Sequence, residues 1–468
     1  MATILKKLLI PLFLLLIFSC RKDSFSTDPA IRLDATADTV HFDTVFTTTG
    51  SATQSFKIIN DNNRAIHISS VRLAGGGSSP FKINVDGITG PQINNIDINA
   101  NDSAYIFVSL SINPTAANLD FIVRDSIEIV YNGNKKIIQL DAFGRNAHFF
   151  RNKVIKTTET WDNDRPYVIL GRMTVDTNAV LVINKGCRVY IHADAPFIVN
   201  GSLLVNGEKW DSTRVVFAGD RLDEPYRDFP AGYPGFIFSD VSKNNVINYG
   251  IIKNAYQGMV VLDPSPNANP KLTLNETIID NAYDAGILGI NTSITARNLL
   301  VSNCGKNLVL IKGGDYRFTH STIATVSNNY IQHKDPVLGL SNFIIQNNIV
   351  AANPLNAVFR NCIFWGESSL VDNEVIVLKQ GTTPYSVVFD RVLWRVKDQP
   401  ANITVTAPPI NNQNPEFDSV DVNKRVYSFR LKNTSPAKNT GINAGVVIDL
   451  DGAMRPVAQP DMGAYERQ

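Results

Sequence analysis

The sequence predicts an all-β protein, on three observations. Short runs of alternating apolar and polar residues recur along the chain, turn-forming residues are frequent, and an apolar pair returns at intervals beyond residue 150. Of the 468 residues 29 are Gly and 23 are Pro, and about one in ten is Asn, all of which favour turns over helix interiors. The first part is expected to form a β-sandwich and the second part a solenoid of stacked coils.

Charge and composition exclude two classes of protein. The chain carries 44 Lys and Arg against 43 Asp and Glu, a net charge of +1, so no basic surface is available to gather nucleic acid. A hydrophobic content of 44% is ordinary for a chain that buries a core, which excludes a disordered tail or a fibre. Nucleic acid is therefore not an expected partner.

The first 19 residues have the pattern of a secretory signal. Lys6 and Lys7 precede an apolar run at 8–18, which is too short to span a bilayer. Residues 17–20 resemble a bacterial lipobox, which implies cleavage before Cys20 and lipidation of its thiol. The alternative is a secretory signal that is cleaved elsewhere. Residues 20–32 would then be a polar tether, and the expected location is the cell envelope, as an outer-membrane lipoprotein facing the periplasm or the surface.

Residues 33–147 are predicted to form a small β-sandwich. Alternating runs recur about every dozen residues, separated by turn clusters at 75–77 and 132–134, as two packed antiparallel sheets require. The stretch 56–61, with 66–68 after it, resembles the bacterial Ig-like domains that sit between a lipid anchor and a functional module. The resemblance implies an Ig-like sandwich that acts as a spacer.

Residues 150–468 are predicted to wind into coils. An apolar pair can be aligned at 251–252, 278–279, 300–301, 323–324, 363–364 and 393–394. Steps of this size correspond to one turn of a parallel β-helix, in which each coil stacks on its neighbours. The longest step leaves room for a loop or an extra coil around 343–349. At the coil that contains 323–324, the alignment has to shift by one residue to place Phe318 in the same apolar column as Leu274 and Phe359.

Asn254, Asn281 and Asn303 fall in one column of this alignment, each at a bend. Stacked amides can hydrogen-bond along the axis, so these residues are expected to form a structural asparagine ladder. The next column holds small residues, including Cys304. We therefore interpret the three cysteines after Cys20 as buried packing residues.

The opening segment of this region, 161–217, resembles the first coils of right-handed parallel β-helix proteins of the Bacteroidetes surface. At the other end, residues 435–466 resemble the closing segment of bacterial right-handed β-helix proteins, and the resemblance implies a cap over the last coil. Asp449, Asp451 and Asp461 are interpreted as cap and turn residues rather than calcium ligands, because no EF-hand spacing is present. No metal site and no cofactor is predicted.

The best candidate binding site is the loop at 219–235, which combines carboxylates, arginines and aromatic residues. Aromatic rings pack on the C–H faces of sugars and carboxylates bond to hydroxyls, so a polysaccharide is the candidate ligand. The alternative is that the loop merely covers one side of the solenoid and its charges pair with one another. The glycan-binding candidates in this loop are Asp223, Glu224, Tyr226, Asp228 and Tyr233.

Trp365 is the second candidate. Its column companions in the alignment are polar, including Asp280 and Thr325, so it is expected to face water as a sugar platform and to be markedly more exposed than Trp394. A loop that simply covers it is the alternative. His320 and His333 form the only His-bearing polar neighbourhood of the solenoid, where a lyase-like base could lie, although surface or turn roles are the commoner fate of scattered histidines.

These patterns favour a lipid-anchored protein that binds a polysaccharide or a surface partner along the solenoid flank. The alternative is a polysaccharide lyase or glycoside hydrolase acting on an extracellular glycan. A lyase needs a base and a group that neutralises the uronate, and a hydrolase needs two carboxylates at a defined separation. Neither set can be identified from the sequence, and enzymatic activity is left open. The membrane, reached through the lipid anchor, is the other expected partner.

Overall fold

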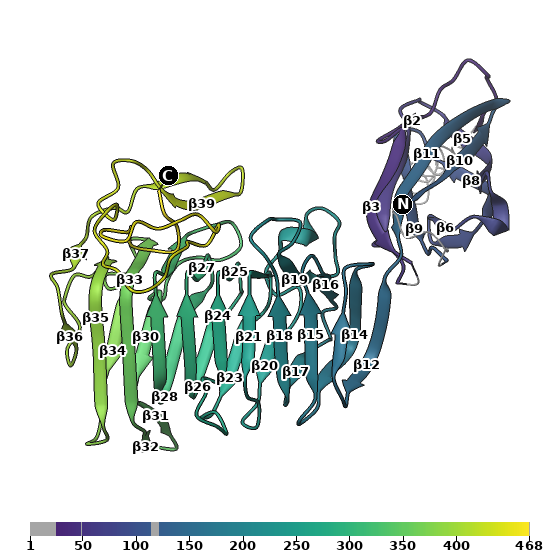
Figure 1. The fold of residues 1–468 in the computed structure, drawn as a ribbon. Coiled ribbons are helices and arrows are strands. Elements are labelled where there is room, and N and C mark those ends of the chain that lie inside the picture. Colours follow the sequence, from purple (N-terminus) through teal and green to yellow (C-terminus); the bar gives the residue numbers. More distant parts are fainter. Residues whose placement is uncertain (1–24, 48, 114–120, 468) are drawn as a thin grey trace, which may run out of the picture. The chain divides into compact units, whose positions relative to one another are not determined.

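The computed structural model describes residues 25–47, 49–113 and 121–467 (Figure 1). The chain divides into two compact units, residues 1–146 and 147–468. Within the described residues the helices are two single 3-10 turns, η1 (Gly76–Ser78) and η2 (Tyr226–Asp228), and the other regular elements are β-strands. The predicted all-β class is confirmed. The signal predicted at 1–19 and the lipidation site Cys20 lie outside the described residues.

In the part of the chain that the structure describes, no helix combines the length and the hydrophobicity needed to cross a bilayer.

The first unit contains two sheets that enclose one apolar core. Buried and more exposed residues alternate along most of the longer strands, as in β6, where Phe81, Ile83 and Val85 point inward. The first sheet consists of β1 (Phe25–Ser26), β3 (Thr39–Phe46), β5 (Ala65–Leu73), β8 (Gln92–Ile98), β10 (Phe121–Tyr131) and β11 (Asn134–Arg145). The second consists of β2 (Asp34–Ala35), β4 (Gln54–Asn60), β6 (Phe81–Val85), β7 (Ile88–Gly90) and β9 (Asp102–Leu110).

Turn chemistry fixes the longest hairpin of this unit. β10 and β11 pair antiparallel, and the chain reverses at Asn132 and Gly133, both of which have positive φ. An Asn-Gly pair suits such a two-residue turn because both residues tolerate the left-handed region. One expectation is corrected here. Phe25 and Ser26, predicted to belong to a tether, form β1 and pair in parallel with β5.

The second unit is built from parallel strands that stack turn upon turn (Figure 1). Most strands pair with a strand two or three places later in the chain, the offset is larger where a hairpin at 343–352 intervenes, and the pairings within this sheet are parallel. Its strands are β12 (His148–Ile155), β13 (Glu159–Trp161), β14 (Tyr167–Val175), β15 (Val180–Asn184), β16 (Arg188–Ile191), β17 (Phe197–Val199), β18 (Ser202–Asn206), β19 (Val215–Gly219), β20 (Phe236–Phe238), β21 (Asn245–Asn248), β22 (Gly250–Lys253), β23 (Met259–Leu262), β24 (Leu272–Asn275), β25 (Ile278–Asp280), β26 (Ala285–Arg297), β27 (Leu300–Ser302), β28 (Lys306–Thr319), β29 (Thr322–Val326), β30 (Leu338–Ser341), β33 (Leu355–Glu367), β34 (Val375–Leu378), β35 (Tyr385–Trp394), β36 (Thr404–Val405) and β37 (Ile410–Asn411).

Stacking places equivalent apolar residues above one another inside the second unit. One inward column consists of Val189, Phe217, Ile252, Ile279, Val301, Ile323, Phe364 and Trp394, all fully buried. The predicted alignment was off by one residue at one coil, because Val301 pairs with Ile323 rather than with Ala324. The slip that the sequence required there is confirmed by the pairing of Phe318 with Phe359. Cys187, Cys304 and Cys362 are buried free thiols.

Two short hairpins form two-stranded sheets of their own and do not pair with the stacked strands. β31 (Phe343–Gln346) and β32 (Ile349–Ala352) pair antiparallel, with Ile345 and Ile349 exposed, so the long step around 343–349 is a projecting loop. β38 (Phe417–Asp421) and β39 (Val426–Leu431) form the second hairpin.

The C-terminal segment, residues 435–467, lies along the side of the stack and not over its last coil, which corrects the prediction of a cap. Main-chain atoms of this segment bond to side chains from several successive turns: Arg214 to Leu450, Asn298 to Ile448, His320 to Asp461 and Asn361 to Ile442. The last long strand, β35, is instead followed by β36 and β37, which pair with it.

The side chains that hold this segment form a column of buried polar residues at one bend. Glu276, Asn298, His320 and Asn361 have φ between 46° and 54° and are almost fully buried. Polar residues are tolerated there because each finds partners in the C-terminal segment or in the neighbouring turn, as in the bond from the Asn298 amide to Glu276 at 2.9 Å. At this bend the C-terminal segment is therefore held to the stack by hydrogen bonds to buried polar side chains.

The geometry fixes His320 as a neutral imidazole. Its Nδ1 lies 3.1 Å from the Asp461 carbonyl, which can only accept, and its Nε2 lies 2.9 Å from the amide nitrogen of Asn361. That amide cannot flip, because it also donates to the carbonyl of Ile442 at 2.7 Å while its oxygen accepts the Ile442 N–H at 3.0 Å. Burial lowers the pKa of His320 to about 3.

His320 is expected to make the fold less stable in acid. A histidine whose folded pKa lies below its unfolded value contributes stability that is complete above pH 6.5 and is lost as the pH falls toward 3. At pH 5 this corresponds to about 2 kcal/mol. His320→Asn, which keeps a residue suited to positive φ, should remove this loss.

The measurement is the free energy of unfolding in urea between pH 4 and pH 8, compared between wild type and variant. The free energy of the variant has to be subtracted from that of the wild type, because Glu466 titrates in an overlapping pH range. Burial raises the pKa of Glu466 to about 7, so the fold loses stability through this residue as the pH rises. A difference that does not change with pH would contradict the assignment of His320.

Candidate functional site

The candidate site begins at the bend after β22, β25 and β27. Asn254, Asn281 and Asn303 each follow one of these strands directly and have φ of 63°, 56° and 53°. Asparagine is among the few residues that adopt this region readily, and in-register stacking then aligns the three amides. The Asn281 amide donates to the Asn254 side-chain oxygen at 2.8 Å.

The predicted ladder is broken at its third residue. The Asn303 amide donates to the carboxylate of Asp280 at 3.1 Å and not to Asn281. Asp280 also accepts from the Ser302 hydroxyl at 2.6 Å. A carboxylate at the end of β25 therefore takes the place that a third rung of the ladder would have.

The loop between β19 and β20 docks on these amides through its own main chain. The Asn254 amide donates to the carbonyl of Arg227 at 2.7 Å, and the Asn281 amide donates to the carbonyl of Asp228 at 3.0 Å. The loop in turn donates from Gly232 N–H to the Asn254 carbonyl at 2.8 Å. The asparagine column thus fixes the loop to the flank of the stack.

Two other segments reach the same place. The turn of the β38–β39 hairpin brings Arg425, whose guanidinium donates to Asp228 at 2.7 Å. The loop after β29 brings Tyr330, whose ring lies 5.4 Å from the Arg425 guanidinium and 5.0 Å from the Phe229 ring. Phe229 also packs against Tyr226.

These segments enclose a small polar cavity of about 130 Å³, which we name the asparagine cleft. Its residues come from three turns of the stack, two loops and the hairpin, and they carry two carboxylates, two cations, four amides and two phenol rings. They are Asp228, Lys253, Asn254, Asp280, Asn281, Asn303, Asn328, Tyr330, Arg425 and Tyr427.

The two carboxylates of the asparagine cleft lie in different environments. Burial raises the pKa of Asp280, although Ser302, Asn303 and the charge of Lys253 act in the opposite direction. Asp228 is paired with the guanidinium of Arg425. The cleft also contains a buried acceptor, the side-chain oxygen of Asn281, which has no hydrogen-bond partner among the described residues.

Exposed aromatic rings lie on the same two turns. Tyr256 and Tyr283 follow Asn254 and Asn281 by two residues, are 47% and 53% exposed, and stack with ring centres 5.8 Å apart. Beside them Gln257 donates to Asp284 at 2.8 Å. This tyrosine pair was not identified from the sequence, although two tyrosines at equivalent alignment positions were the available signal.

Of the predicted loop residues, the structure brings only Asp228 into the asparagine cleft. Asp223 is held by Arg221 at 2.7 Å and Glu224 pairs with Arg227, so these charges satisfy one another, as the alternative interpretation expected. Tyr226 is exposed and lies beneath the Arg221 guanidinium, with 4.0 Å between them.

The prediction that Tyr233 and Trp365 are exposed glycan-binding residues is wrong. Tyr233 is only 1% exposed, because it bridges to Ala255 in the stack and its ring enters the core. Trp365 is 6% exposed against 0% for Trp394, so it is no sugar platform. Trp365 does lie in the outward column, next to Ala324, but it is buried in an apolar cluster together with residues of β39 and of the C-terminal segment.

His333, the other sequence candidate, is fully buried and lies apart from His320. Its Nε2 is 2.8 Å from Glu374, which also lies 3.5 Å from Arg395. Glu374 is fully buried as well. This group holds the loop after β29 to the stack and is closed to a ligand.

The sequence did not identify most of the asparagine cleft. Asp280 appeared only as a polar companion of Trp365, and Arg425 and Tyr427 come from a hairpin far along the chain. Within the described residues, no group of three or more His, Cys, Asp or Glu side chains is arranged to hold a metal ion.

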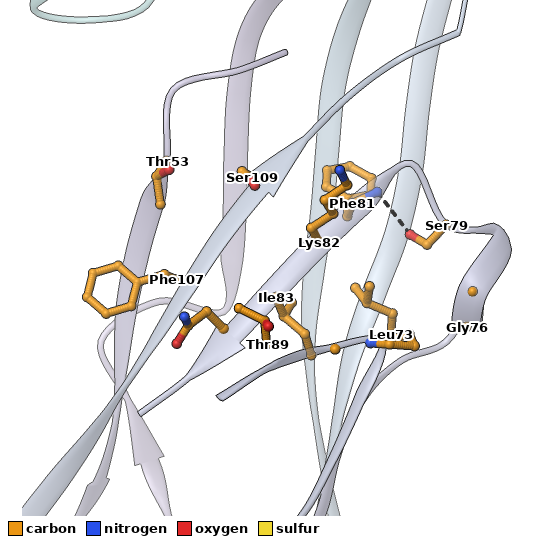
Figure 2. A pocket seen from close by; sticks show the side chains of 14 residues that line it. Thr53, Leu73, Gly76, Ser79, Phe81, Lys82, Ile83, Thr89, Phe107 and Ser109 are labelled. Carbon is orange, nitrogen blue, oxygen red and sulfur yellow. Dashed lines mark hydrogen bonds between the residues drawn. The ribbon is translucent and has the colours of Figure 1, made fainter. Parts of the chain in front are cut away.

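The first unit has a larger groove of about 660 Å³ at the edge of its two sheets (Figure 2). Strands β5, β6 and β9 and the turn η1 contribute to it. Phe107, Lys82 and Thr89 lie along it, and Ser79 bonds to the N–H of Phe81 at 3.1 Å. It contains no cluster of ionisable groups comparable with the asparagine cleft.

Comparison with known proteins adds little. No family model matches the sequence, and no curated protein matches it. Among solved structures, a family 123 glycoside hydrolase from Clostridium perfringens, described for glycolipid glycan hydrolysis, is 11% identical, with 28% of this chain and 30% of that chain covered and a TM-score of 0.19.

Two further likenesses are of the same order. The periplasmic chaperone SfaE is 11% identical, with 25% of this chain and 58% of that chain covered and a TM-score of 0.18. A PapD-like domain of human CEP192 is 8% identical, with 27% and 96% covered and a TM-score of 0.17. The chain spans less than two thirds of the hydrolase and of SfaE. Similarity this low carries no argument about fold or function.

Asn281 is expected to hold the loop at 220–235 in place. Asn281→Gly keeps a residue suited to positive φ and removes only the amide, whereas Asn281→Ala also strains the backbone. Both variants should make the loop more susceptible to limited proteolysis. The free energy of unfolding should fall by about 1–2 kcal/mol in the Gly variant and by about 1 kcal/mol more in the Ala variant.

The cleavage sites are identified by mass spectrometry and the unfolding free energies are measured in urea. Unchanged cleavage of the loop in the Gly variant would show that the Asn281 amide does not hold it.

Proposed function

We propose that this protein binds a polysaccharide, with the asparagine cleft as the recognition site. The observation that carries the proposal is the concentration of donors and acceptors in one cavity, including the unpartnered oxygen of Asn281. Sugar hydroxyls donate and accept at once, so they can satisfy carboxylates, ammonium groups and amides that lie side by side. A buried acceptor without a partner costs stability unless a ligand supplies the missing donor.

The size of the cleft limits what enters it. About 130 Å³ is well below the volume of most small-molecule sites, roughly 300–1,000 Å³. We therefore propose that it takes one terminal sugar or one projecting substituent. The stacked Tyr256 and Tyr283 offer a surface on which the next sugar of the chain can pack its C–H face.

Glycoside hydrolysis is the second candidate function. The observation that favours it is the pair of carboxylates, Asp228 and Asp280, that line one cavity in unlike environments. Hydrolases use one carboxyl that retains its proton as the acid and a second that stays ionised as the base or nucleophile. Asp280, with its raised pKa, suits the first role, and Asp228 suits the second.

We propose the same domain architecture that the sequence favours. The first unit would be an Ig-like β-sandwich that acts as a spacer, which its two sheets around one core support. The second would be a right-handed parallel β-helix, which the turn-by-turn parallel pairing supports. The protein would be attached to the cell envelope through lipidated Cys20, on the strength of the signal sequence and lipobox.

The glycan proposal is tested with a panel of soluble neutral and acidic polysaccharides. Wild type should bind at least one of them, and Asp280→Asn should weaken that binding about tenfold or more, the effect of losing a hydrogen bond to a charged group. Asp372→Asn is the matched control, since Asp372 is exposed and pairs with Lys397 outside the cleft. Binding is followed by calorimetry.

The same incubations are assayed for new reducing ends and unsaturated uronates. Products that disappear in Asp280→Asn would favour the hydrolase. Binding without products leaves a binding protein. No binding and no product across the panel would overturn both functions.

The lipid anchor is tested with Cys20→Ser in a bacterial host supplied with labelled palmitate. Wild type should incorporate the label and partition into detergent, because acyl chains add roughly 0.8 kcal/mol of membrane affinity per buried methylene. The variant should do neither and should remain in the aqueous phase. Equal labelling of the two proteins would exclude Cys20 as the acylated residue.

A further inference from the structure

A second groove crosses strands β26, β28, β33 and β35 and shares no residue with the asparagine cleft. Its volume is about 610 Å³, within the range of roughly 300–1,000 Å³ that is usual for ligand sites. Its residues are mostly prolines and neutral polar side chains: Pro264, Asn291, Thr292, Ser293, Gly314, Asp315, Pro354, Leu355, Asn356, Pro384, Tyr385 and Ser386.

The groove follows the direction in which the turns stack. Thr292 pairs with Gly314, Gly314 with Leu355, and Leu355 with Tyr385, so one column crosses four strands. At the usual strand spacing this is a length of about 14 Å. Glycine is required at position 314, because its φ is 128° and a Cβ there would lie only 2.4 Å from the Thr292 carbonyl oxygen.

Two buried hydroxyls of the groove residues lack partners. Thr292 is 1% exposed, and neither its hydroxyl nor that of Tyr385 has a hydrogen-bond partner among the described residues. A buried hydroxyl without a partner costs free energy, and valine and phenylalanine would fill the same space without that cost. A ligand bound in the groove would supply the partners that the fold does not provide for these two hydroxyls.

The charges of the groove indicate a neutral ligand. Its lining contains no lysine or arginine, and the ammonium of Lys379 lies against one lining residue, 4.9 Å from the centre of the Tyr385 ring. The single carboxylate, Asp315, accepts from the Asn356 amide at 3.0 Å and lies 3.8 Å from Arg317. An anionic ligand would find no cation in the lining, whereas the asparagine cleft offers Lys253 and Arg425.

We propose that this groove binds an extended segment of a neutral glycan, with its sugar units lying on successive strands. The repeat of an extended sugar chain is close to the spacing between strands, so similar contacts can recur at each turn. The outward polar row consists of Ser293, Asp315, Asn356 and Ser386, and the proline and tyrosine rings supply apolar faces. That the ligand is a glycan rests on the proposed function. The groove, and not the asparagine cleft, would then bind the extended part of the glycan chain.

The first test removes the two hydroxyls without changing shape. Thr292→Val with Tyr385→Phe should weaken binding of a neutral oligosaccharide by about fivefold or more, the effect of about one lost hydrogen bond. The melting temperature should stay equal or rise, which separates this result from unfolding. Affinity measured over a length series should increase up to about three sugar units, the length that the groove spans.

The second test blocks the groove. Ser386→Trp places a large ring at an exposed position of the lining and should abolish binding of the neutral oligosaccharides. Ile376→Trp, at an exposed position of β34 outside the groove, is the control and should bind as wild type does. Binding that survives Ser386→Trp, or oligogalacturonate bound in preference to the neutral series, would overturn the proposal.

The outcomes separate the two sites. Asp280→Asn weakening polysaccharide binding while Ser386→Trp leaves it unchanged would retain the proposed function and reject the groove. The reverse pattern would retain the groove and reject the asparagine cleft. Failure of wild type to bind any polysaccharide would reject both.

Discussion

Parallel main-chain hydrogen bonding between successive turns is the constraint on which the rest of the second unit depends. Because each strand pairs in register with the strand of the next turn, equivalent residues of successive turns lie above one another and form columns. Inward columns collect apolar residues such as Ile252, Ile279 and Val301 into one continuous core. A residue that suits its position in one turn therefore has to suit its neighbours above and below.

Residues at the bends between strands also stack in columns, but these columns are polar rather than apolar. Positive φ recurs at equivalent bends, and there the stacked residues are polar. Buried away from water, they need partners outside the column. At one bend His320 and Asn361 are satisfied by the C-terminal segment, which is thereby fixed along the flank. At another, Asn254 and Asn281 hold the loop between β19 and β20. Structural amides of this kind determine where loops can dock.

Both proposed sites are consequences of this arrangement. The asparagine cleft forms where a bend, two loops and a hairpin meet, so its charged groups come from segments distant in sequence and balance one another. The second groove forms on the strands themselves, along the column that runs from Thr292 through Gly314 to Leu355. One site is rich in charge and small, and the other is neutral and elongated, which suits them to different parts of a glycan chain.

The sequence by itself determined the all-β class, most of the coil register and the position of the asparagine bends, because strand alternation and the tolerance of asparagine for positive φ are local properties. It could not determine which polar residues meet. Arg425 reaches Asp228 only through a distant hairpin, and Trp365 is buried in its outward column because residues of that hairpin and of the C-terminal segment form an apolar cluster with it. Such contacts depend on where loops pack against the stack, and that is set by tertiary hydrogen bonds between residues far apart in the chain.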